Sequence, residues 1–442
     1  MDKIEIVLTI FWILMMSILS YKRIGHGFSI IKVFNLVWLA SYLVYLLNPY
    51  EYYELNGLVH LYTCIFVCIV NVSFVFTIRN KAIHYSIDFK NIEFEFDLIK
   101  TQVRILGLLS FVSWIFSYNR IRHSLSIVMT TGMHSLRTYV YNGDVFSTIE
   151  RLIYQYFVQP MFIVTILIAL QILIFYRFKR YRYILLVAFV DAFMYSLLFG
   201  GRALLVLIVM YAMFMLLINN GGKIMRIIMT QGKSVLLIGV IALIVLAYSM
   251  MRVSRSWGAI SEYGVYITGG IPYLSYLIDS GKLHTGALLG KGIIGGIYDF
   301  FGLALSVIGH PIPLVSQVYS SYVNDFVKVS ESVTTNFTAT AMTAFLLDAG
   351  VIGLILGSMV CGWIFAKAEN SFQNKFSVFS LSVFVYITNS AFETIQNYTY
   401  KSVVFVMVIM ILWLLFGKGR IGSKRIVIGH QNNNGGYHDC NQ

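Results

Sequence analysis

Eleven long apolar stretches are the feature that most constrains how this chain can fold. A helix that crosses a lipid bilayer needs about 17 to 25 mostly apolar residues. The stretches, of which the fourth is short, cover residues 4–20, 29–47, 57–78, 104–118, 157–176, 183–199, 203–218, 234–250, 349–366, 376–392 and 402–416. We therefore predict an all-α, polytopic membrane protein with about 11 transmembrane helices.

The composition excludes two other classes of protein. Hydrophobic residues make up 58% of the 442 residues and charged residues 12%, against about 45–50% and about 25% in ordinary globular domains. A set of soluble domains is therefore excluded. A disordered chain is also excluded, because such chains are poor in aromatic residues and this one is 16% aromatic.

The connections between the stretches alternate in charge. One set holds 21 of the 33 Lys and Arg residues, whereas the opposite set holds 12 basic and 13 acidic residues. Basic connections face the cytoplasm in membrane proteins, so we predict an exterior N-terminus and a cytoplasmic C-terminus. Orientation and contact with anionic lipid then explain the net charge of +13, and no nucleic-acid partner is expected.

The predicted spans divide the chain into four parts. Residues 1–250 form an N-terminal bundle of eight spans, and residues 349–416 form a C-terminal bundle of three. Residues 251–348 form a large exterior loop with short helices, which we expect to bear the active site because such long loops are usually functional. Its glycine-rich part, 283–308, predicts a re-entrant or interfacial helix. Residues 417–442 are expected to be a disordered cytoplasmic tail.

Arg202 is the first candidate for binding an anion on the exterior side. It follows Gly200 and Gly201 in a tight turn between two spans. Flanking glycines let backbone amides and a guanidinium approach a phosphate together. The alternative is an arginine whose side chain simply extends to the membrane surface beside a glycine turn.

Arg252 and Arg255 form a second basic feature, just after the eighth span. Their spacing of three places both on one face if the helix continues for a turn. Two guanidiniums match a pyrophosphate, because each binds oxygens in bidentate fashion. Together with Arg202 they could surround one diphosphate, and anchoring to lipid headgroups is the alternative.

The N-terminal bundle carries a smaller exterior loop at 119–156, which is also basic. Its basic residues are Arg120, Arg122, His123, His134 and Arg137. We include Arg137 among the candidate substrate-binding residues, with headgroup contact as the alternative.

Two exterior residues are candidates for a general base. His310 precedes Pro311 and Pro313, which hold the backbone extended and present the imidazole from a stiff segment. A hydrogen-bonded structural histidine is the alternative. Glu262 lies seven residues beyond Arg255 and could orient an arginine or take a proton.

Asp191 is an acidic residue near the middle of the sixth span, where an ionisable group must face protein or water. Proton coupling is one interpretation, and pairing with a neighbouring helix is the other. The other spans show no chain of ionisable residues at depth, which favours pairing.

The sequence carries no signature of a metal or nucleotide site. His and Cys residues do not occur at ligand spacing, and the glycine-rich stretches lack the Lys and Ser or Thr of a phosphate loop. We therefore expect no metal and no cofactor, and an ATP-driven pump is disfavoured.

Two short motifs resemble a known family. They comprise Phe199, Gly200, Gly201 and Arg202 at the start of a short span and, after the long exterior loop, Asn336, Phe337, Thr338, Asp348, Ala349, Gly350 and Gly353. Together with the span count, the sidedness and the loop lengths, this pattern is similar to the O-antigen and capsule repeat-unit polymerases of the Wzy type. That family is similar to the O-antigen ligases.

The resemblance implies a GT-C-like glycosyltransferase in the bacterial inner membrane. Such an enzyme joins undecaprenyl-diphosphate-linked oligosaccharide repeat units on the outer side of the membrane. In the ligases, exterior arginines hold the lipid diphosphate and a histidine near the end of the large loop activates the acceptor hydroxyl. The resulting candidates are Arg202, Arg252, Arg255, Arg137, Asn336 and Asp348 for binding the diphosphate or substrate, and His310 and Glu262 for catalysis.

Two other functions stay open, a lipid-linked oligosaccharide flippase or other transporter, and an O-antigen ligase. The absence of an internal repeat disfavours the transporter. Thr335 disfavours the ligase, because ligases have His immediately before the Asn of this motif. The expected partners are the lipid-linked oligosaccharides, the bilayer and a protein that regulates chain length.

Overall fold

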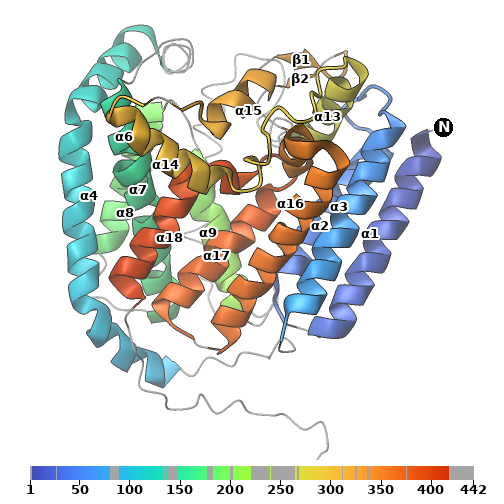
Figure 1. Cartoon of the computed structure of the whole chain (residues 1–442). Coiled ribbons are helices and arrows are strands. Elements are labelled where there is room, and N and C mark those ends of the chain that lie inside the picture. The colour runs from blue at the N-terminus through green and yellow to red at the C-terminus, as the bar shows by residue number, and fades with distance from the viewer. Residues whose placement is uncertain are drawn as a thin grey trace, which may run out of the picture.

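The protein is described here from a computed structural model, drawn in Figure 1. The described residues are 2–25, 27–79, 89–132, 136, 147–176, 183–199, 203–220, 239, 264–265, 268–310, 312–323, 326–331, 333–335, 339–374 and 376–417. They are helical almost throughout, with one two-stranded hairpin among them. The all-α prediction is confirmed.

Long helices run side by side and form the body of the molecule. In chain order they are α1 (Asp2–Ile24), α2 (Ile30–Leu47), α3 (Gly57–Thr77), α4 (Phe89–Thr131), α6 (Thr148–Ile153), η1 (Tyr154–Val158), α7 (Gln159–Gln171), η2 (Ile172–Tyr176), α8 (Tyr183–Phe199), α9 (Ala203–Asn219), α16 (Ala341–Asn374), α17 (Val378–Glu393) and α18 (Val403–Phe416). Six helices of the described part are long and apolar enough to cross a membrane. A multi-pass membrane protein is the architecture they support.

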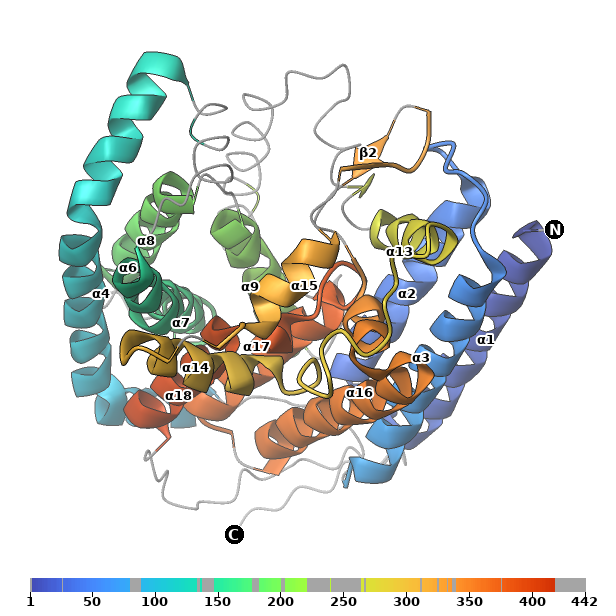
Figure 2. The same ribbon diagram turned by 45° about the horizontal axis from the view of Figure 1, so that its top comes forward.

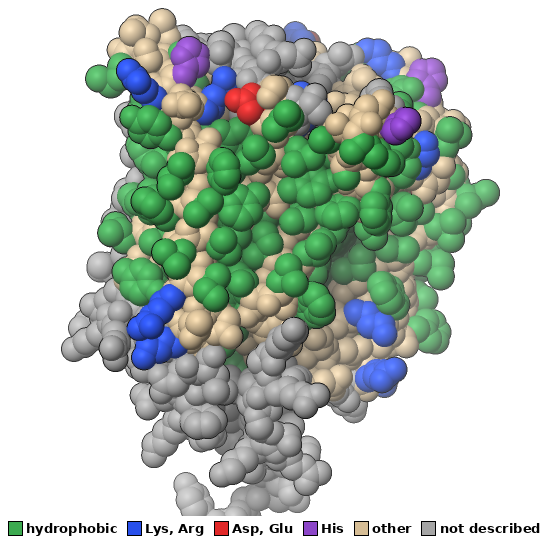
Figure 3. Space-filling view, turned by 60° about the vertical axis from the view of Figure 1, so that its left-hand side comes forward, with side chains coloured by type: hydrophobic (Ala, Val, Ile, Leu, Met, Phe, Trp, Pro, Cys, Tyr) green, Lys and Arg blue, Asp and Glu red, His purple; other side chains and the backbone are tan. Residues whose placement is uncertain are grey.

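The outer surface of this helix bundle is apolar. Figure 3 shows hydrophobic side chains covering one face of the molecule, with basic residues toward both ends. Large hydrophobic side chains point outward from several helices, for example Phe11 on α1 and Leu108 on α4, which are 65% and 66% exposed. Soluble monomers rarely expose apolar patches of more than a few hundred Å², so this surface is suited to lipid.

A second layer of short elements covers one end of the bundle. It contains α13 (Gly270–Asp279), α14 (Gly295–Val307), α15 (Val315–Val323), β1 (Val327–Lys328) and β2 (Thr334–Thr335), and we call the described residues between 268 and 340 the cap. Figure 2 shows α14 and α15 lying across the end of the bundle. The N-terminus lies at this same end, in agreement with the charge pattern, which places the N-terminus and the large loop on one side.

The hairpin ties the cap to the connection between α2 and α3. Its strands are antiparallel, with Val327 opposite Thr335, and Tyr52 forms an isolated bridge with Ser330 beside them. The Tyr52 hydroxyl also shares a hydrogen bond of 2.7 Å with the Thr268 hydroxyl. The cap is therefore attached at both the beginning and the end of its chain.

Polar side chains define where several helices begin. The Asn56 side chain accepts a hydrogen bond from the Leu58 amide at the start of α3, at 2.9 Å. At the start of α17, Ser377 and Ser380 cap each other's backbone amides in a reciprocal box. Such caps satisfy amides that have no partner within the helix, and they fix where each apolar segment enters the bundle.

A break in α16 separates its first turns from the long segment that follows. Gly350 has φ +61°, a conformation that glycine adopts without strain. A Cβ at Gly353 would collide with the Phe345 carbonyl oxygen, and one at Gly357 would collide with the Phe345 ring. The three glycines thus let residues 341–348 fold back against the segment that follows the break.

Two helices extend beyond the predicted spans. The span predicted at 104–118 is the central part of α4, which continues to Thr131. Arginines and histidines lower the hydropathy after residue 118, but no glycine or proline interrupts the helix before Gly132.

The span predicted at 349–366 begins at the break in α16 but continues to Asn374. The extension is stabilised because its buried carboxylate, Glu369, has hydrogen-bond donors. Glu369 accepts hydrogen bonds from the Ser29 hydroxyl and the Ile30 amide, at 2.7 and 3.1 Å. A buried carboxylate with two donors avoids most of the cost of desolvation, so hydropathy alone placed the end of the helix too early.

Candidate functional site

The cap rests on the bundle at η4 (Thr399–Lys401), a short 3-10 turn that links α17 to α18. The first turn of α14 lies directly on it. A Cβ at Gly296 would lie 2.5 Å from the Tyr400 carbonyl oxygen and 2.6 Å from that of Ser402, so only glycine allows this approach. We call the polar groups around this contact the η4 site. They are Asp299, Tyr319, Asn389, Glu393, Thr399, Tyr400 and Lys401.

Lys401 is the basic residue of the η4 site. Its Nζ lies 3.3 Å from the centroid of the Tyr319 ring, in a cation–π arrangement. No described residue forms a hydrogen bond with this Nζ. Burial lowers the pKa of Lys401 to about 7, and the negative charge of Asp299 acts in the opposite direction. The amine therefore changes its charge near neutral pH and has free N–H donors.

Asp299 fixes the position of the ring that covers Lys401. Its two carboxylate oxygens accept hydrogen bonds from the Val315 and Ser316 amides, at 2.6 and 3.0 Å. These amides begin α15, where a negative charge is favourable. Burial raises the pKa of Asp299, while these hydrogen bonds and Lys401 oppose the rise. Asp299 on α14 thus anchors α15, the helix that carries Tyr319.

Glu393 is the carboxylate of the η4 site and ends α17. Its Oε1 accepts a hydrogen bond from the Asn389 amide and its Oε2 from the Thr399 hydroxyl, both at 2.7 Å. The side chain is only partly buried. The two hydrogen bonds hold this carboxylate in one orientation. Each oxygen keeps a second acceptor position, with which the carboxylate can accept a proton.

Two tyrosines place hydroxyl groups near this carboxylate. Tyr211 on α9 and Tyr400 on η4 are 0% and 6% exposed, and both interact electrostatically with Glu393. Among the described residues, neither hydroxyl has a hydrogen-bond partner. Buried hydroxyls without a partner are uncommon, and burial raises the pKa of Tyr400. That hydroxyl therefore stays protonated at neutral pH.

Asp348, a residue predicted from the sequence, is buried at the break in α16. Its carboxylate accepts hydrogen bonds from the Gly292 and Ile293 amides, at 3.0 and 3.4 Å. The Ile293 carbonyl accepts a hydrogen bond from Tyr398 of 2.6 Å, and Tyr398 directly precedes η4. Asp348 therefore lies close to the η4 site and holds the segment that leads into α14.

His310, the other predicted residue within the described part, lies elsewhere. It is exposed, and it follows the far end of α14 from the contact with η4. A helix rises about 1.5 Å per residue, so the length of α14 separates His310 from that contact by roughly 16 Å. The structure does not bring His310 and the η4 site together.

The remaining predicted residues lie outside the described residues. They are Arg137, Arg202, Arg252, Arg255, Glu262 and Asn336. Sequence reasoning missed Glu393 and Lys401. One signal for Lys401 was present, because it is a basic residue on the predicted exterior side, in a short connection that needs no charge for its orientation.

Asp191 pairs with a neighbouring helix. The Trp114 indole donates a hydrogen bond to its Oδ1 at 2.6 Å, and the Ser110 hydroxyl donates to its Oδ2 at 3.2 Å. Both donors belong to α4, and Ser110 is also bonded to Thr165 on α7. The carboxyl of Asp191 thus joins three helices.

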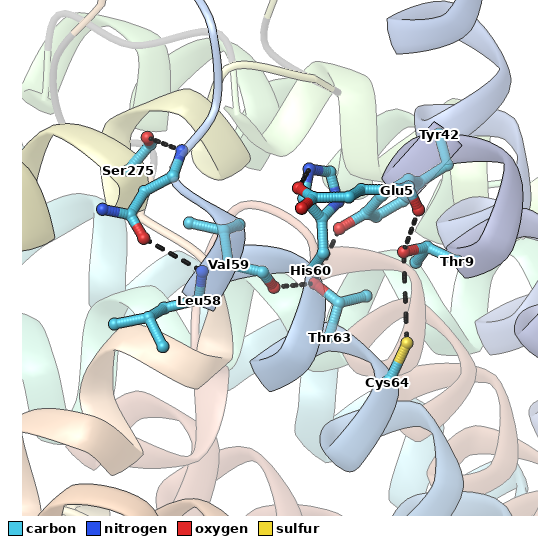
Figure 4. Close-up of polar contacts among 10 residues, drawn as sticks. Glu5, Thr9, Tyr42, Leu58, Val59, His60, Thr63, Cys64 and Ser275 are labelled. Atoms are coloured by element: carbon cyan, nitrogen blue, oxygen red, sulfur yellow. Dashed lines mark hydrogen bonds and ion pairs between the residues drawn. The ribbon is translucent and has the colours of Figure 1, made fainter. Parts of the chain in front are cut away.

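A second group of polar side chains lies near the N-terminus. Figure 4 shows His60 of α3 beside Glu5 of α1, with 3.8 Å between His60 Nε2 and Glu5 Oε2. The His60 ring also packs against the ring of Tyr42 at 61°, with 5.8 Å between the centroids, and the Tyr42 hydroxyl donates a hydrogen bond to Thr63 at 2.9 Å. These contacts link α1, α2 and α3 near the cap and have a clear packing role.

The η4 site offers an amine, Lys401, at one end of η4 and an oriented carboxylate, Glu393, which contacts the other end through Thr399. Within the described ranges, no three or more His, Cys, Asp or Glu side chains form a group that could hold a metal ion. No protein-family model, no curated protein and no solved structure matches the chain. Its function is therefore inferred from the residues themselves.

Proposed function

We propose that this protein is a glycosyltransferase that polymerises undecaprenyl-diphosphate-linked oligosaccharide repeat units into O-antigen or a related surface polysaccharide. The observation that carries the proposal is the η4 site. It combines a lysine with free donors, Lys401, and an oriented carboxylate, Glu393, at one end of an apolar bundle. Lipid-linked substrates present their diphosphate and first sugars at that depth, where the hydrocarbon ends.

The proposed architecture is GT-C-like, with eleven spans, the N-terminus and cap outside and the C-terminus in the cytoplasm. We assign ten of these spans to the six long apolar helices and to the shorter apolar helices α8, α9, α17 and α18. The remaining span is the predicted one at 234–250, which lies outside the described residues. In this arrangement the η4 site faces the outer leaflet of the bacterial inner membrane.

The reaction that we propose breaks the bond between the anomeric carbon of the donor and a phosphate oxygen. A new bond forms from that carbon to a hydroxyl oxygen of the acceptor repeat unit. The hydroxyl proton passes to a base, and undecaprenyl diphosphate leaves with the bonding electrons. Cationic side chains aimed at the diphosphate stabilise this developing charge, and we assign that role to Arg202, Arg252 and Arg255, with Arg137 and Asn336 as further substrate contacts.

For the base, the geometry favours Glu393 over the two candidates from the sequence. Glu393 is oriented by two hydrogen bonds from Asn389 and Thr399 and is partly exposed at the η4 site, whereas His310 is separated from that site by the length of α14. A base must come within hydrogen-bond reach of the proton that it removes. Glu262 stays a candidate from the sequence. Asp348 acts by positioning the start of α14.

Purified protein given lipid-linked repeat units tests the assignment of the base. We expect Glu393→Gln to lower the rate of chain lengthening by about 100-fold or more, because general bases typically contribute 10²–10⁴-fold. The matched control is Glu331→Gln, since Glu331 is an exposed cap carboxylate paired with Lys328 at 2.8 Å. Normal lengthening by Glu393→Gln would remove Glu393 as the base and leave His310 and Glu262 for the same assay.

A flippase for the same lipid-linked oligosaccharides is the second candidate function. The break in α16 favours it, because transporters build midplane sites from interrupted helices. The break lies at the cap end of α16, however, and Asp191 in the bundle is occupied by Trp114 and Ser110. A flippase would move repeat units across vesicles without changing their length.

A further inference from the structure

We propose that Lys401 is a donor-binding residue whose ammonium contacts a phosphate oxygen of the lipid-linked diphosphate. This inference rests on the proposed function and adds to it a specific contact that the exterior arginines do not supply. It is drawn from the geometry around η4, where the Tyr319 ring covers the amine of Lys401 and no described residue accepts a hydrogen bond from it.

The first argument is the way in which Lys401 is held. Its Nζ lies 3.3 Å from the centre of the Tyr319 ring, and Tyr319 is 3% exposed. The ring occupies one side of the ammonium through a cation–π contact, which uses none of its three N–H donors as hydrogen bonds. Those donors can bind the oxygens of an anion.

The second argument is that Asp299, the described carboxylate that acts on Lys401, already has hydrogen-bond partners. Asp299 lies close enough to affect Lys401 electrostatically, but its oxygens accept the Val315 and Ser316 amides. It therefore anchors α15 and does not form an ion pair with the lysine. The free-energy cost of partly burying the charge of this amine is therefore not offset by an ion pair with Asp299. The negative charge of a bound phosphate would offset it.

The third argument concerns the charged and titratable groups that the described residues place around Lys401. Asp299 faces it from α14 and Tyr319 from α15. Tyr400 is its neighbour in η4, Glu393 of α17 contacts the other end of η4 through Thr399, and α18 has no ionisable residue. The amine has a pKa of about 7 in the free protein. A diphosphate diester carries two negative charges, so its binding raises that pKa and draws a proton onto Lys401.

A purely structural role would leave binding of the lipid unaffected by the protonation of Lys401. Calorimetry separates the two roles, because the number of protons taken up on binding follows from measurements in buffers of different ionisation enthalpy. The probe is an undecaprenyl-diphosphate-linked monosaccharide, whose phosphates are diesters and do not titrate near pH 7. For the wild type we expect uptake of nearly one proton at pH 8 and almost none at pH 6.

Two variants test whether Lys401 is the group that takes up this proton. Lys401→Arg should bind the probe with no proton uptake at pH 8, because a guanidinium is always charged. Lys401→Met should bind about 10- to 100-fold more weakly at pH 6, because a charge-assisted hydrogen bond is lost. The control is Lys282→Met, since Lys282 is an exposed cap lysine over the Tyr276 ring, at 5.5 Å, and should behave like the wild type.

The outcomes distinguish the inference from the function on which it rests. Full proton uptake by folded Lys401→Arg would overturn the inference and leave the proposed function standing. Equal uptake when phosphatidylglycerol replaces the probe would show that Lys401 binds lipid headgroups, which also overturns the donor assignment alone. A wild type that binds no diphosphate-linked probe would overturn both.

Discussion

Replacing Gly296 by alanine tests whether the backbones of α14 and η4 are in close contact at this glycine. The new Cβ would lie 2.5 and 2.6 Å from the carbonyl oxygens of Tyr400 and Ser402, whereas carbon–oxygen contacts normally lie at about 3.3–3.6 Å. Backbone oxygens cannot turn away, so α14 must move by nearly 1 Å. Overpacking of this kind costs about 1–3 kcal/mol.

The matched control is Gly302→Ala on the same helix. Its Cβ would meet only the end of the Leu314 side chain, at 3.0 Å, and alanine is favoured over glycine in a helix by about 1 kcal/mol. We therefore expect Gly302→Ala to be more stable than Gly296→Ala by about 1–3 kcal/mol. The measurement is the free energy of unfolding in mixed micelles of mild detergent and dodecyl sulfate. Equal stability of the two variants would refute the close contact.

Three further predictions concern charged groups. The wild type should gain stability relative to Lys401→Met by about 1.4 kcal/mol per pH unit above pH 7, measured by unfolding at several pH values. The reason is that the pKa of Lys401 is about 7 in the folded protein and 10.5 in the unfolded chain, so the unfolded chain binds more protons between these two pH values. A stability difference between wild type and variant that does not change with pH would contradict this prediction. Arg202→Ala should abolish polymer in cells with normal protein levels, and Arg202→Lys should rescue poorly because lysine lacks the bidentate fork; full polymer from Arg202→Ala would exclude that residue. Asp191→Ala should cost about 1–3 kcal/mol of stability by leaving Trp114 and Ser110 without their acceptor, while the turnover of folded protein stays unchanged; lost turnover would favour proton coupling.

The membrane architecture could be predicted because it depends on local properties of the chain. Runs of apolar residues mark the helices, and the alternation of basic connections places the N-terminus and the cap on one side. Helix ends were less accurate. Glu369 and the arginines after residue 118 lower the hydropathy, yet α16 and α4 continue through them. The partners of Glu369 come from α2, which hydropathy cannot register.

The η4 site could not be predicted, because its parts are distant in the sequence. Lys401 meets Tyr319 of α15 and the start of α14 at Gly295 only after the cap has folded onto the bundle. Asp348 was a candidate because of its motif, but its partners, the amides of Gly292 and Ile293, lie in a glycine-rich segment without a signal of its own. Residues joined by long-range contacts leave no periodic pattern in either segment.

The most direct test of the proposed function is the length of the glycan made by purified protein from one substrate. Lipid-linked repeat units are supplied without nucleotide sugar or nucleoside triphosphate, in the presence and absence of a metal chelator, and the products are separated by size. A glycosyl diphosphate carries its own leaving group, so we predict a ladder of lengthened lipid-linked glycans that chelator does not change. Glycans that keep the length of one repeat unit, with transport of that unit across vesicles measured instead, would contradict the enzyme and identify a flippase.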